Sequence, residues 1–209
     1  MFENSENWVV LKFGGTSVSS VANWRNIAGV LRDRMAANFR PVVVHSAMSG
    51  VTDRLEALLS AAIAGGHVAV LEQIERGHRD LASKLGIVPD ARFDAFIDEL
   101  KSMADAIAET RELGDRIRAR VMAMGELLAT SLGATFLSAQ GIASVWVDAR
   151  HYLRAEHRHG TNEKAGLLSA TCDFAPDARL RADWRALGGV VITQGFIAAN
   201  DDGDTIATD

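Results

Sequence analysis

The sequence predicts an α/β protein with a mainly parallel sheet. Residues 8–13 and 42–44 are apolar runs that each end in a polar, glycine-bearing segment, and each segment precedes hydrophobic residues at helical spacing. The order strand–loop–helix–strand–loop–helix requires parallel strands joined by right-handed crossovers. Because parallel strands end at the same edge of a sheet, the two loops share one crevice if the strands are neighbours.

The composition is that of one globular domain or of a large piece of one. The 209 residues are 48% hydrophobic and 23% charged, with a net charge of −5, and this length can bury a sizeable core. The mild acidity argues against nucleic acid as a partner. No apolar run approaches the roughly 20 residues of a membrane span. A single cysteine, and acidic residues near the N-terminus where a secretory signal has basic ones, predict a cytoplasmic protein.

Each of the first two strands is followed by an amphipathic helix. Hydrophobic residues recur at helical spacing over 21–35, with Ser19 or Ser20 as the N-cap. A second set over 55–63 predicts another helix, which Gly65 ends. These helices complete two βα units.

The middle of the chain is predicted to be helical. Three stripes of hydrophobic residues at helical spacing cover 71–85, 93–107 and 117–136, and the second begins just after a Pro-Asp pair. We expect an antiparallel helical excursion over about 67–140 that returns the chain to the sheet.

The last third of the chain returns to strands. Residues 143–147 and 190–194 are apolar runs that predict a third and a fourth strand, while 150–189 is polar and irregular. The final segment AANDDGDTIATD has an Asp-Gly turn signal beside a short β-like run, which predicts a hairpin that is only half present. The chain is therefore expected to stop inside a domain.

The segment KFGGTSV, residues 12–18, ends the first strand. Consecutive glycines are costly in a plain turn, but they allow backbone N–H groups and a helix N-terminus to face an anion. Lys12 could neutralise the oxygens of a transferring phosphoryl group. Neither G-x-x-x-x-G-K-[ST] nor G-x-G-x-x-G follows this strand. The alternative is a glycine turn with a lysine whose stem lies along apolar surface.

The segment HSAMSGVT, residues 45–52, follows the second strand. Small residues and hydroxyls at this place are what a pocket for a polar ligand needs. The alternative is a loop that only caps the next helix, with Thr52 or Asp53 as the N-cap.

A glycine and a carboxylate, Gly125 and Glu126, interrupt the apolar stripe RVMAMGELLATSL. Glycine costs about 1 kcal/mol in a helix interior. A carboxylate between Met124 and Leu127 must face solvent or find a partner. It could bind the ammonium group of a substrate, and the alternative is a solvated helix face.

Five segments, VVLKFGGTSVS, VVVHSAMSGVTD, MAMGELLAT, VDAR and VVITQGFIA, have the order and spacing of aspartate kinases, which the sequence resembles over nearly its whole length. The resemblance implies a three-layer α/β/α sandwich with a mainly parallel sheet, of the amino-acid kinase type. Residues 1–209 would be its N-terminal, substrate-binding portion, with the C-terminal part of the domain absent. HRDLASKLG and LSATCDFAPD are most similar to bifunctional proteins that also carry diaminopimelate decarboxylase.

The resemblance implies that ATP phosphorylates the side chain of L-aspartate to give 4-phospho-L-aspartate, the first step toward lysine, threonine and methionine. Mg²⁺ would bridge the phosphates of ATP. By motif, the resemblance assigns Lys12 to the transferring phosphoryl group; Gly14, Gly15, Thr16 and Ser17 to the phosphate-side loop; Ser46, Thr52 and Phe196 to the aspartate pocket; and Glu126 to the α-ammonium group of aspartate.

The sequence also departs from the family pattern. The Gly-Arg-Gly-Gly-Ser-Asp string of aspartate kinases is not in the chain, and Gly-Glu-Leu stands where many relatives have Gly-Glu-Arg. We therefore expect little or no kinase activity from these residues alone. A non-catalytic amino-acid-binding regulatory module and a related carboxylate or carbamate kinase remain as alternatives, and the sequence leaves a homo-oligomer open.

Two further features are predicted to carry no chemistry. His151, Glu156, His157 and His159 form a local cluster, but their spacing fits no common zinc site, so we expect a solvated loop and no metal. Nothing nearby marks Cys172 as a low-pKa nucleophile, so we expect a spectator thiol.

Overall fold

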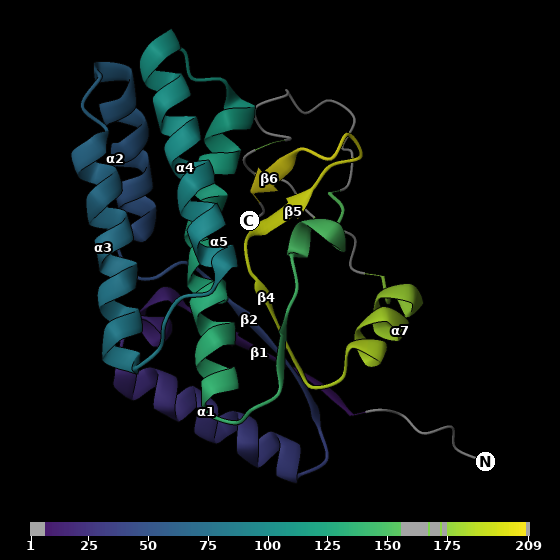
Figure 1. Ribbon diagram of the computed structural model, residues 1–209. Coiled ribbons are helices and arrows are strands. Elements are labelled where there is room, and N and C mark those ends of the chain that lie inside the picture. The colour runs from purple at the N-terminus through teal and green to yellow at the C-terminus, as the bar shows by residue number, and fades with distance from the viewer. Residues whose placement is uncertain (1–6, 156–166, 168–171, 173–174, 208–209) are drawn as a thin grey trace.

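The computed structural model describes residues 7–155, 167, 172 and 175–207, and there it has the predicted mainly parallel sheet (Figure 1). The strands are β1 (Trp8–Phe13), β2 (Arg40–His45), β3 (Ser144–Trp146), β4 (Val190–Gln194), β5 (Ile197–Ala199) and β6 (Thr205–Ala207). The first four form a parallel sheet in the order β1-β2-β4-β3, and β5-β6 is an antiparallel pair. Because β1 and β2 are direct neighbours, the loops after them share one crevice, as the sequence predicts.

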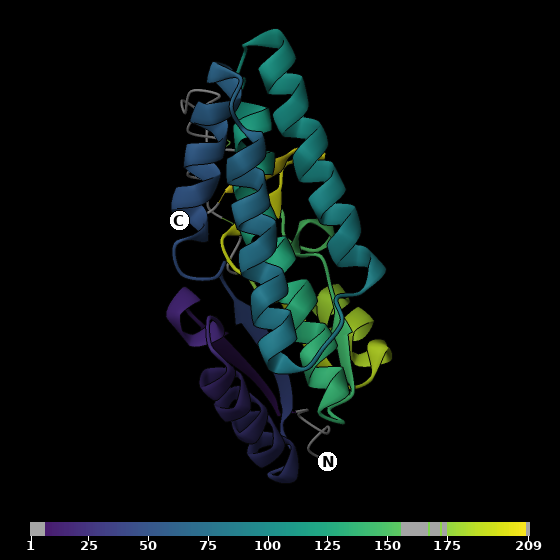
Figure 2. The same cartoon turned by 60° about the vertical axis from the view of Figure 1, so that its left-hand side comes forward.

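Helices cover one face of the sheet in two tiers (Figures 1 and 2). They are α1 (Val21–Ala36), α2 (Val51–Ala64), α3 (Val68–Leu85), α4 (Ala91–Thr110) and α5 (Asp115–Ala139). α1 and α5 pack on the strands through a core that joins Trp24 and Leu132 to Val43 and Ile192. α2, α3 and α4 pack on α5 and on one another. α3, α4 and α5 occupy the predicted helical excursion over about 67–140.

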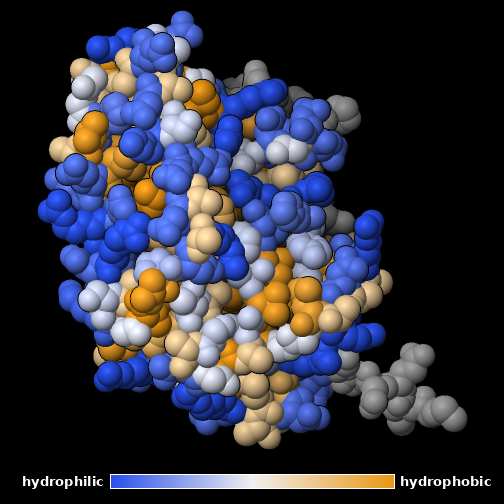
Figure 3. Space-filling model, in the orientation of Figure 1, coloured by the Kyte–Doolittle hydropathy of each residue, from blue (hydrophilic) through white to orange (hydrophobic). Residues whose placement is uncertain are grey.

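The opposite face carries a helix that the sequence does not predict. α7 (Ala178–Leu187) lies within 150–189, a segment predicted to be irregular, and no residue of α7 is buried. Four of its ten residues are charged, and Trp184 is the α7 residue that packs against the sheet, with Val42 and Val191. α7 supplies the second outer layer of the sandwich. Val10 of β1 on this face is 64% exposed. Figure 3 shows apolar side chains at the surface next to α7.

The helix starts confirm one predicted N-cap and correct another. α1 begins after Ser20, whose hydroxyl caps it. α2 begins at Val51 after Gly50, so the prediction of Thr52 or Asp53 as N-cap is wrong. The φ of Gly50 is +74°, a left-handed conformation that glycine adopts without steric cost. α2 therefore begins before the residues predicted to cap it, and Thr52 lies in its first turn beside the crevice.

The hairpin near the end of the chain has both of its strands, so the prediction of a half-present hairpin is wrong. β5 pairs with β6 from Ile197 opposite Ala207 to Ala199 opposite Thr205. The sequence hides β5 because this strand has only three residues and follows β4 after just Gly195 and Phe196. Phe196, with a φ of +61°, turns the chain out of the parallel sheet.

α5 qualifies, by length and composition only, as a helix that could cross a membrane, contrary to the expectation that no apolar run approaches a span. Most of its apolar window, 83%, is buried inside the protein. The central helix of a packed core has the same composition, so a single such helix is weak evidence for a membrane.

Candidate functional site

The loops after β1 and β2 are in direct contact. Ser49 N–H donates a hydrogen bond to Ser19 Oγ at 2.9 Å, and Ser19 Oγ donates to the carbonyl oxygen of Gly15 at 2.5 Å. A Cβ atom on Gly15 would lie only 2.7 Å from the carbonyl oxygen of Ala47. Gly15 is therefore required for this approach, and the two loops form one surface.

α5 reaches this surface through the glycine that seemed costly in the sequence. A Cβ atom on Gly125 would lie 2.8 Å from Ala47 Cβ and 3.2 Å from Leu55 Cδ1. The bare backbone thus allows α5 to contact the loop after β2. Next to the contact, Ala47 N–H donates a hydrogen bond to Glu126 Oε1 at 3.2 Å.

The Glu126 carboxylate is buried, which excludes the alternative of a solvated helix face. The residue is 8% exposed. Burial raises the pKa of Glu126 to about 7, and the Ala47 N–H opposes this rise. Among the described residues no cation pairs with this carboxylate. A buried carboxylate without a cation is suited to bind a positively charged ligand.

A cavity of about 480 Å³ lies against Glu126 and the two loops. Six of the residues that the sequence analysis assigned line it: Gly15, Thr16, Ser46, Thr52, Glu126 and Phe196. Another part of the wall, which the sequence does not reveal, comes from Ile197 of β5 and Ala207 of β6. That wall depends on a hairpin whose position no local pattern reveals.

Lys12, Gly14 and Ser17 do not line the cavity. Lys12 is exposed at the end of β1, and its Nζ lies 4.5 Å from the centroid of the Phe196 ring, which does line it. This is cation–π distance, so the ammonium lies beside the cavity mouth. Gly14 is exposed with open space where a Cβ would lie, and its carbonyl oxygen accepts from Ser17 N–H at 2.9 Å.

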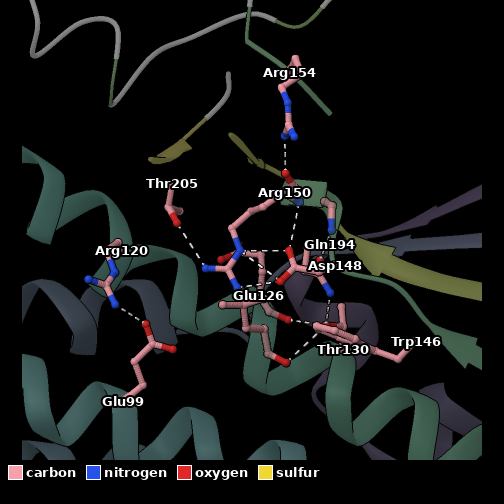
Figure 4. A network of polar contacts seen from close by, with 12 residues as sticks. Glu99, Arg120, Glu126, Thr130, Trp146, Asp148, Arg150, Arg154, Gln194 and Thr205 are labelled. Carbon is pink, nitrogen blue, oxygen red and sulfur yellow. Dashed lines mark hydrogen bonds and ion pairs between the residues drawn. The ribbon is translucent and has the colours of Figure 1, made fainter. Parts of the chain in front are cut away.

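A polar network that the sequence does not reveal anchors α5 one turn after Glu126 (Figure 4). Thr130 Oγ1 donates to the Glu126 carbonyl oxygen at 2.8 Å and accepts from Trp146 Nε1 at 2.9 Å and Gln194 Nε2 at 2.8 Å. Gln194 Oε1 in turn accepts from Ala149 N–H at 2.8 Å. The network ties α5 to the ends of β3 and β4 and so fixes the turn that carries Glu126.

The same network region contains a partly buried ion pair. Arg150 Nη2 lies 2.7 Å from Asp148 Oδ2, and Arg150 Nη1 donates to Thr205 Oγ1 at 3.2 Å (Figure 4). The guanidinium is thus engaged in tying the 3₁₀ turn Ala149–His151 to β6.

The predicted absence of a zinc site rests partly on residues outside the described ones. Glu156, His157 and His159 lie there, whereas His151 is exposed. Among the described residues, no three His, Cys, Asp or Glu side chains form a group that could hold a metal ion. Cys172 is half-buried, and its role as a spectator stays a prediction.

Known proteins are similar to this chain in sequence and in fold. The profile of the amino acid kinase family matches residues 7–209. The chain is 27% identical to the aspartokinase of Chlamydia muridarum, over 98% of this chain and 43% of that protein. It is 28% identical to the bifunctional aspartokinase/homoserine dehydrogenase 2 of Escherichia coli, over 93% of this chain and 23% of that protein.

Solved structures agree. The crystal structure of E. coli aspartokinase III in complex with aspartate and ADP matches with a TM-score of 0.77 and 28% identity, over 97% of this chain and 43% of that one. The chain thus spans less than half the length of these relatives. Since the family profile covers nearly all of its residues, the chain belongs to the amino acid kinase family.

Proposed function

We propose that the protein containing this chain is a transferase that phosphorylates the side-chain carboxylate of L-aspartate with ATP, giving 4-phospho-L-aspartate for the biosynthesis of lysine, threonine and methionine. The observation that carries this proposal is the buried Glu126 carboxylate, which faces the cavity without a cation partner among the described residues. The names of the relatives, and the aspartate and ADP in the E. coli structure, support it.

An α-ammonium group would complete the Glu126 site. Ala47 N–H occupies Oε1, so Oε2 is the oxygen offered to a cation. In a water-poor site this charge-assisted hydrogen bond is stronger than in solution. The hydroxyls of Ser46 and Thr52 line the same cavity and would bind the α-carboxylate, while Phe196 would wall one side.

The reaction demands little covalent chemistry from the protein. The aspartate side chain is already a nucleophile, so in-line positioning and charge neutralisation suffice. The Lys12 ammonium, beside the cavity mouth, would stabilise the charge on the transferring phosphoryl group. The backbone N–H groups of residues 14–17 would face the phosphates.

Mg²⁺ would enter as part of the nucleotide. The described residues offer no group of three carboxylate, thiol or imidazole ligands that could hold a metal ion. Phosphate oxygens commonly supply much of the Mg²⁺ coordination in kinases. We therefore place the ion with the ATP substrate rather than in a protein site.

Several finer properties extend the proposal. The Gly-Arg-Gly-Gly-Ser-Asp string is not in the chain, so these residues alone would show little or no turnover. The segments HRDLASKLG and LSATCDFAPD support a parent protein that also carries diaminopimelate decarboxylase. We propose further that the protein is cytoplasmic and forms a homo-oligomer, and that it has no nucleic-acid or membrane partner.

Binding of aspartate to the chain tests the substrate site. Isothermal titration calorimetry at pH 8, where Glu126 is ionised, should show aspartate binding that Glu126→Gln weakens at least about tenfold, the equivalent of one charge-assisted hydrogen bond. The matched control is Glu72→Gln, a change of the same kind on the outer surface of α3. Equal or tighter binding of glutamate, acetylglutamate or carbamate would instead indicate a related carboxylate or carbamate kinase.

Turnover of the intact gene product tests the chemistry. With ATP and Mg²⁺, aspartate-dependent formation of ADP should fall at least about a hundredfold in Lys12→Met, because one preorganised charge at the phosphoryl group is lost. An intact protein that binds aspartate and forms no ADP would show that it is a regulatory module.

A further inference from the structure

His45 is a fully buried side chain that the proposed reaction does not use. It ends β2, and its ring lies against Trp24 of α1, with the two ring centroids 5.5 Å apart and the planes at 80°. On the α5 side, a Cβ atom on Gly133 would lie 3.0 Å from His45 Nε2. Close packing on both sides holds the ring in one orientation.

The orientation of the ring fixes its tautomer. Nδ1 lies 2.9 Å from the carbonyl oxygen of Ser46, and a carbonyl oxygen can only accept, so Nδ1 carries the proton. Burial lowers the pKa of His45 to about 4, so the ring is neutral at pH 7. Nε2 is buried and has no hydrogen-bond partner among the described residues. The imidazole is therefore a fixed donor aimed at the loop after β2.

The peptide group that accepts this bond is the one that reaches Glu126. The carbonyl oxygen of Ser46 and the N–H of Ala47 belong to the same peptide, and no described peptide bond is cis. A trans peptide directs its C=O and its N–H to opposite sides. His45 thus donates to one side, while the other side donates to Glu126 Oε1 at 3.2 Å. Consecutive hydrogen bonds of this kind polarise and strengthen one another.

We propose that His45 is a positioning residue: its Nδ1–H fixes the peptide between Ser46 and Ala47, so that the Ala47 N–H holds one oxygen of Glu126 and leaves the other oxygen for the ligand's ammonium group. The part concerning the ligand rests on the function proposed above. The part concerning His45, the peptide and the carboxylate stands on the geometry alone.

The competing explanation is that His45 only fills space in the core. Two substitutions separate the explanations, because one keeps the packing of the ring and the other keeps its N–H donor. His45→Phe keeps the volume and the packing against Trp24 but removes the donor. His45→Asn loses ring volume but keeps an N–H donor near the position of Nδ1.

A second buried histidine provides a matched control. His78 in α3 is also fully buried, its Nδ1 lies 2.8 Å from the carbonyl oxygen of Ile74, and its Nε2 has no partner among the described residues. It does not line the cavity. His78→Phe therefore makes the same chemical change away from Glu126.

The test combines NMR with aspartate titration on the full chain. In His45→Phe we expect faster hydrogen exchange of the Ala47 amide, a higher pKa for Glu126 from its carboxyl ¹³C shift, and about tenfold weaker aspartate binding, the effect of one hydrogen bond. His45→Asn should recover most of the affinity despite its lower stability, and His78→Phe should change none of the three. The proposal is overturned if His45→Phe resembles the unmutated chain, or if His45→Asn binds aspartate more weakly than His45→Phe.

A measurement on the unmutated chain covers the case in which a variant does not fold. Long-range ¹H–¹⁵N spectra report which ring nitrogen of His45 carries the proton, and a proton on Nε2 instead of Nδ1 would refute the proposal. If neither the unmutated chain nor the intact gene product binds aspartate, the proposed function fails at this site. The Ala47 exchange rate and the Glu126 titration then still decide the role of His45.

Discussion

Two glycines inside α5 let the helix approach different parts of the molecule. At Gly125 a Cβ atom would lie 2.8 Å from Ala47 Cβ, in the loop that lines the cavity. At Gly133 it would lie 2.5 Å from Trp24 Cη2 and 2.9 Å from Ile192 Cδ1, in the core between α1 and the sheet. Both glycines weaken the helix locally, and both make room for a neighbour.

The neighbours differ in how far they can move. Trp24 and Ile192 are buried in the main hydrophobic core, and a packed core yields little. Ala47 is buried too, but it belongs to the loop after β2, and a loop backbone can shift at smaller cost. We infer that Gly133 contributes mainly to the stability of the fold, whereas Gly125 contributes mainly to the position of Glu126.

The largest expected effect on stability is that of Gly133→Ala. The added methyl group overlaps Trp24 and Ile192. Overpacking of this kind costs about 3 kcal/mol, and the higher helix propensity of alanine offsets about 1 kcal/mol of it, so we expect a net loss of about 2 kcal/mol in the free energy of unfolding. Urea denaturation followed by tryptophan fluorescence measures it. A loss below about 0.5 kcal/mol would show that the core at this end of α5 can relax and that the distinction between the two glycines is wrong.

At the pocket end of α5, Glu126 should make the stability of the protein depend on pH. The raised pKa of Glu126, about 7 against an ordinary value of 4.5, means that folding opposes its ionisation. Its contribution to stability is complete below about pH 4.5 and is lost as the pH rises through 7. Relative to the unmutated chain, Glu126→Gln should therefore be about 2 kcal/mol more stabilising at pH 8 than at pH 5.

At the core end of α5, near Gly133, the buried His45 should make stability depend on pH in the opposite direction. The lowered pKa of His45, about 4, means that its contribution is complete above the unfolded value of 6.5 and is lost as the pH falls through 4. Urea denaturation of Glu126→Gln and His45→Phe from pH 4 to 8 separates the two groups. Parallel pH curves for the unmutated chain and Glu126→Gln would contradict the burial of the Glu126 carboxylate.

The parallel strands and most of the helices could be predicted from the sequence because their signals are local. Continuous apolar runs marked β1, β2 and β4, and Ser20 marked the start of α1. α7 escaped prediction because it is short and four of its ten residues are charged, so it resembles the polar segment around it. β5 escaped because the break before it depends on the backbone conformation of Phe196.

The site was predictable residue by residue but not as an arrangement. The motifs identified Gly15 and Glu126, yet the sequence could not decide whether Glu126 faces solvent. That depends on how closely α5 approaches the loop after β2. The hydrogen bond that joins the two connects Ala47 to Glu126, which are 79 residues apart in the sequence. The bond between Gln194 and Thr130 spans 64 residues, and no periodicity reports a contact of this range.

The network around Thr130 should give an intermediate effect. Thr130→Val keeps the shape but removes the oxygen that accepts from Trp146 and Gln194, which leaves the buried Gln194 amide and the partly buried Trp146 indole N–H unpaired. We expect a loss of about 1–2 kcal/mol in urea denaturation, with an upfield shift of the Trp146 indole N–H signal. Thr135→Val is the control, since its hydroxyl donates only to the backbone of its own helix. Equal losses in the two variants would show that the network adds nothing beyond a local hydrogen bond.

The smallest effect on stability, and the sharpest test of the comparison, is expected from Gly125→Ala. Alanine gains about 1 kcal/mol in helix propensity over glycine, and this offsets much of the cost of displacing Ala47, so the free energy of unfolding should change by less than about 1 kcal/mol. Displacing Ala47 nevertheless moves the N–H that holds Glu126. Aspartate binding should therefore weaken by about tenfold in calorimetry, whereas Gly77→Ala, at a helical glycine with open space around its Cβ position, should leave it unchanged. If Gly125→Ala lost stability as Gly133→Ala does and kept its affinity for aspartate, the two glycines would serve the same purpose, and the close approach of α5 to the loop would matter for the fold alone.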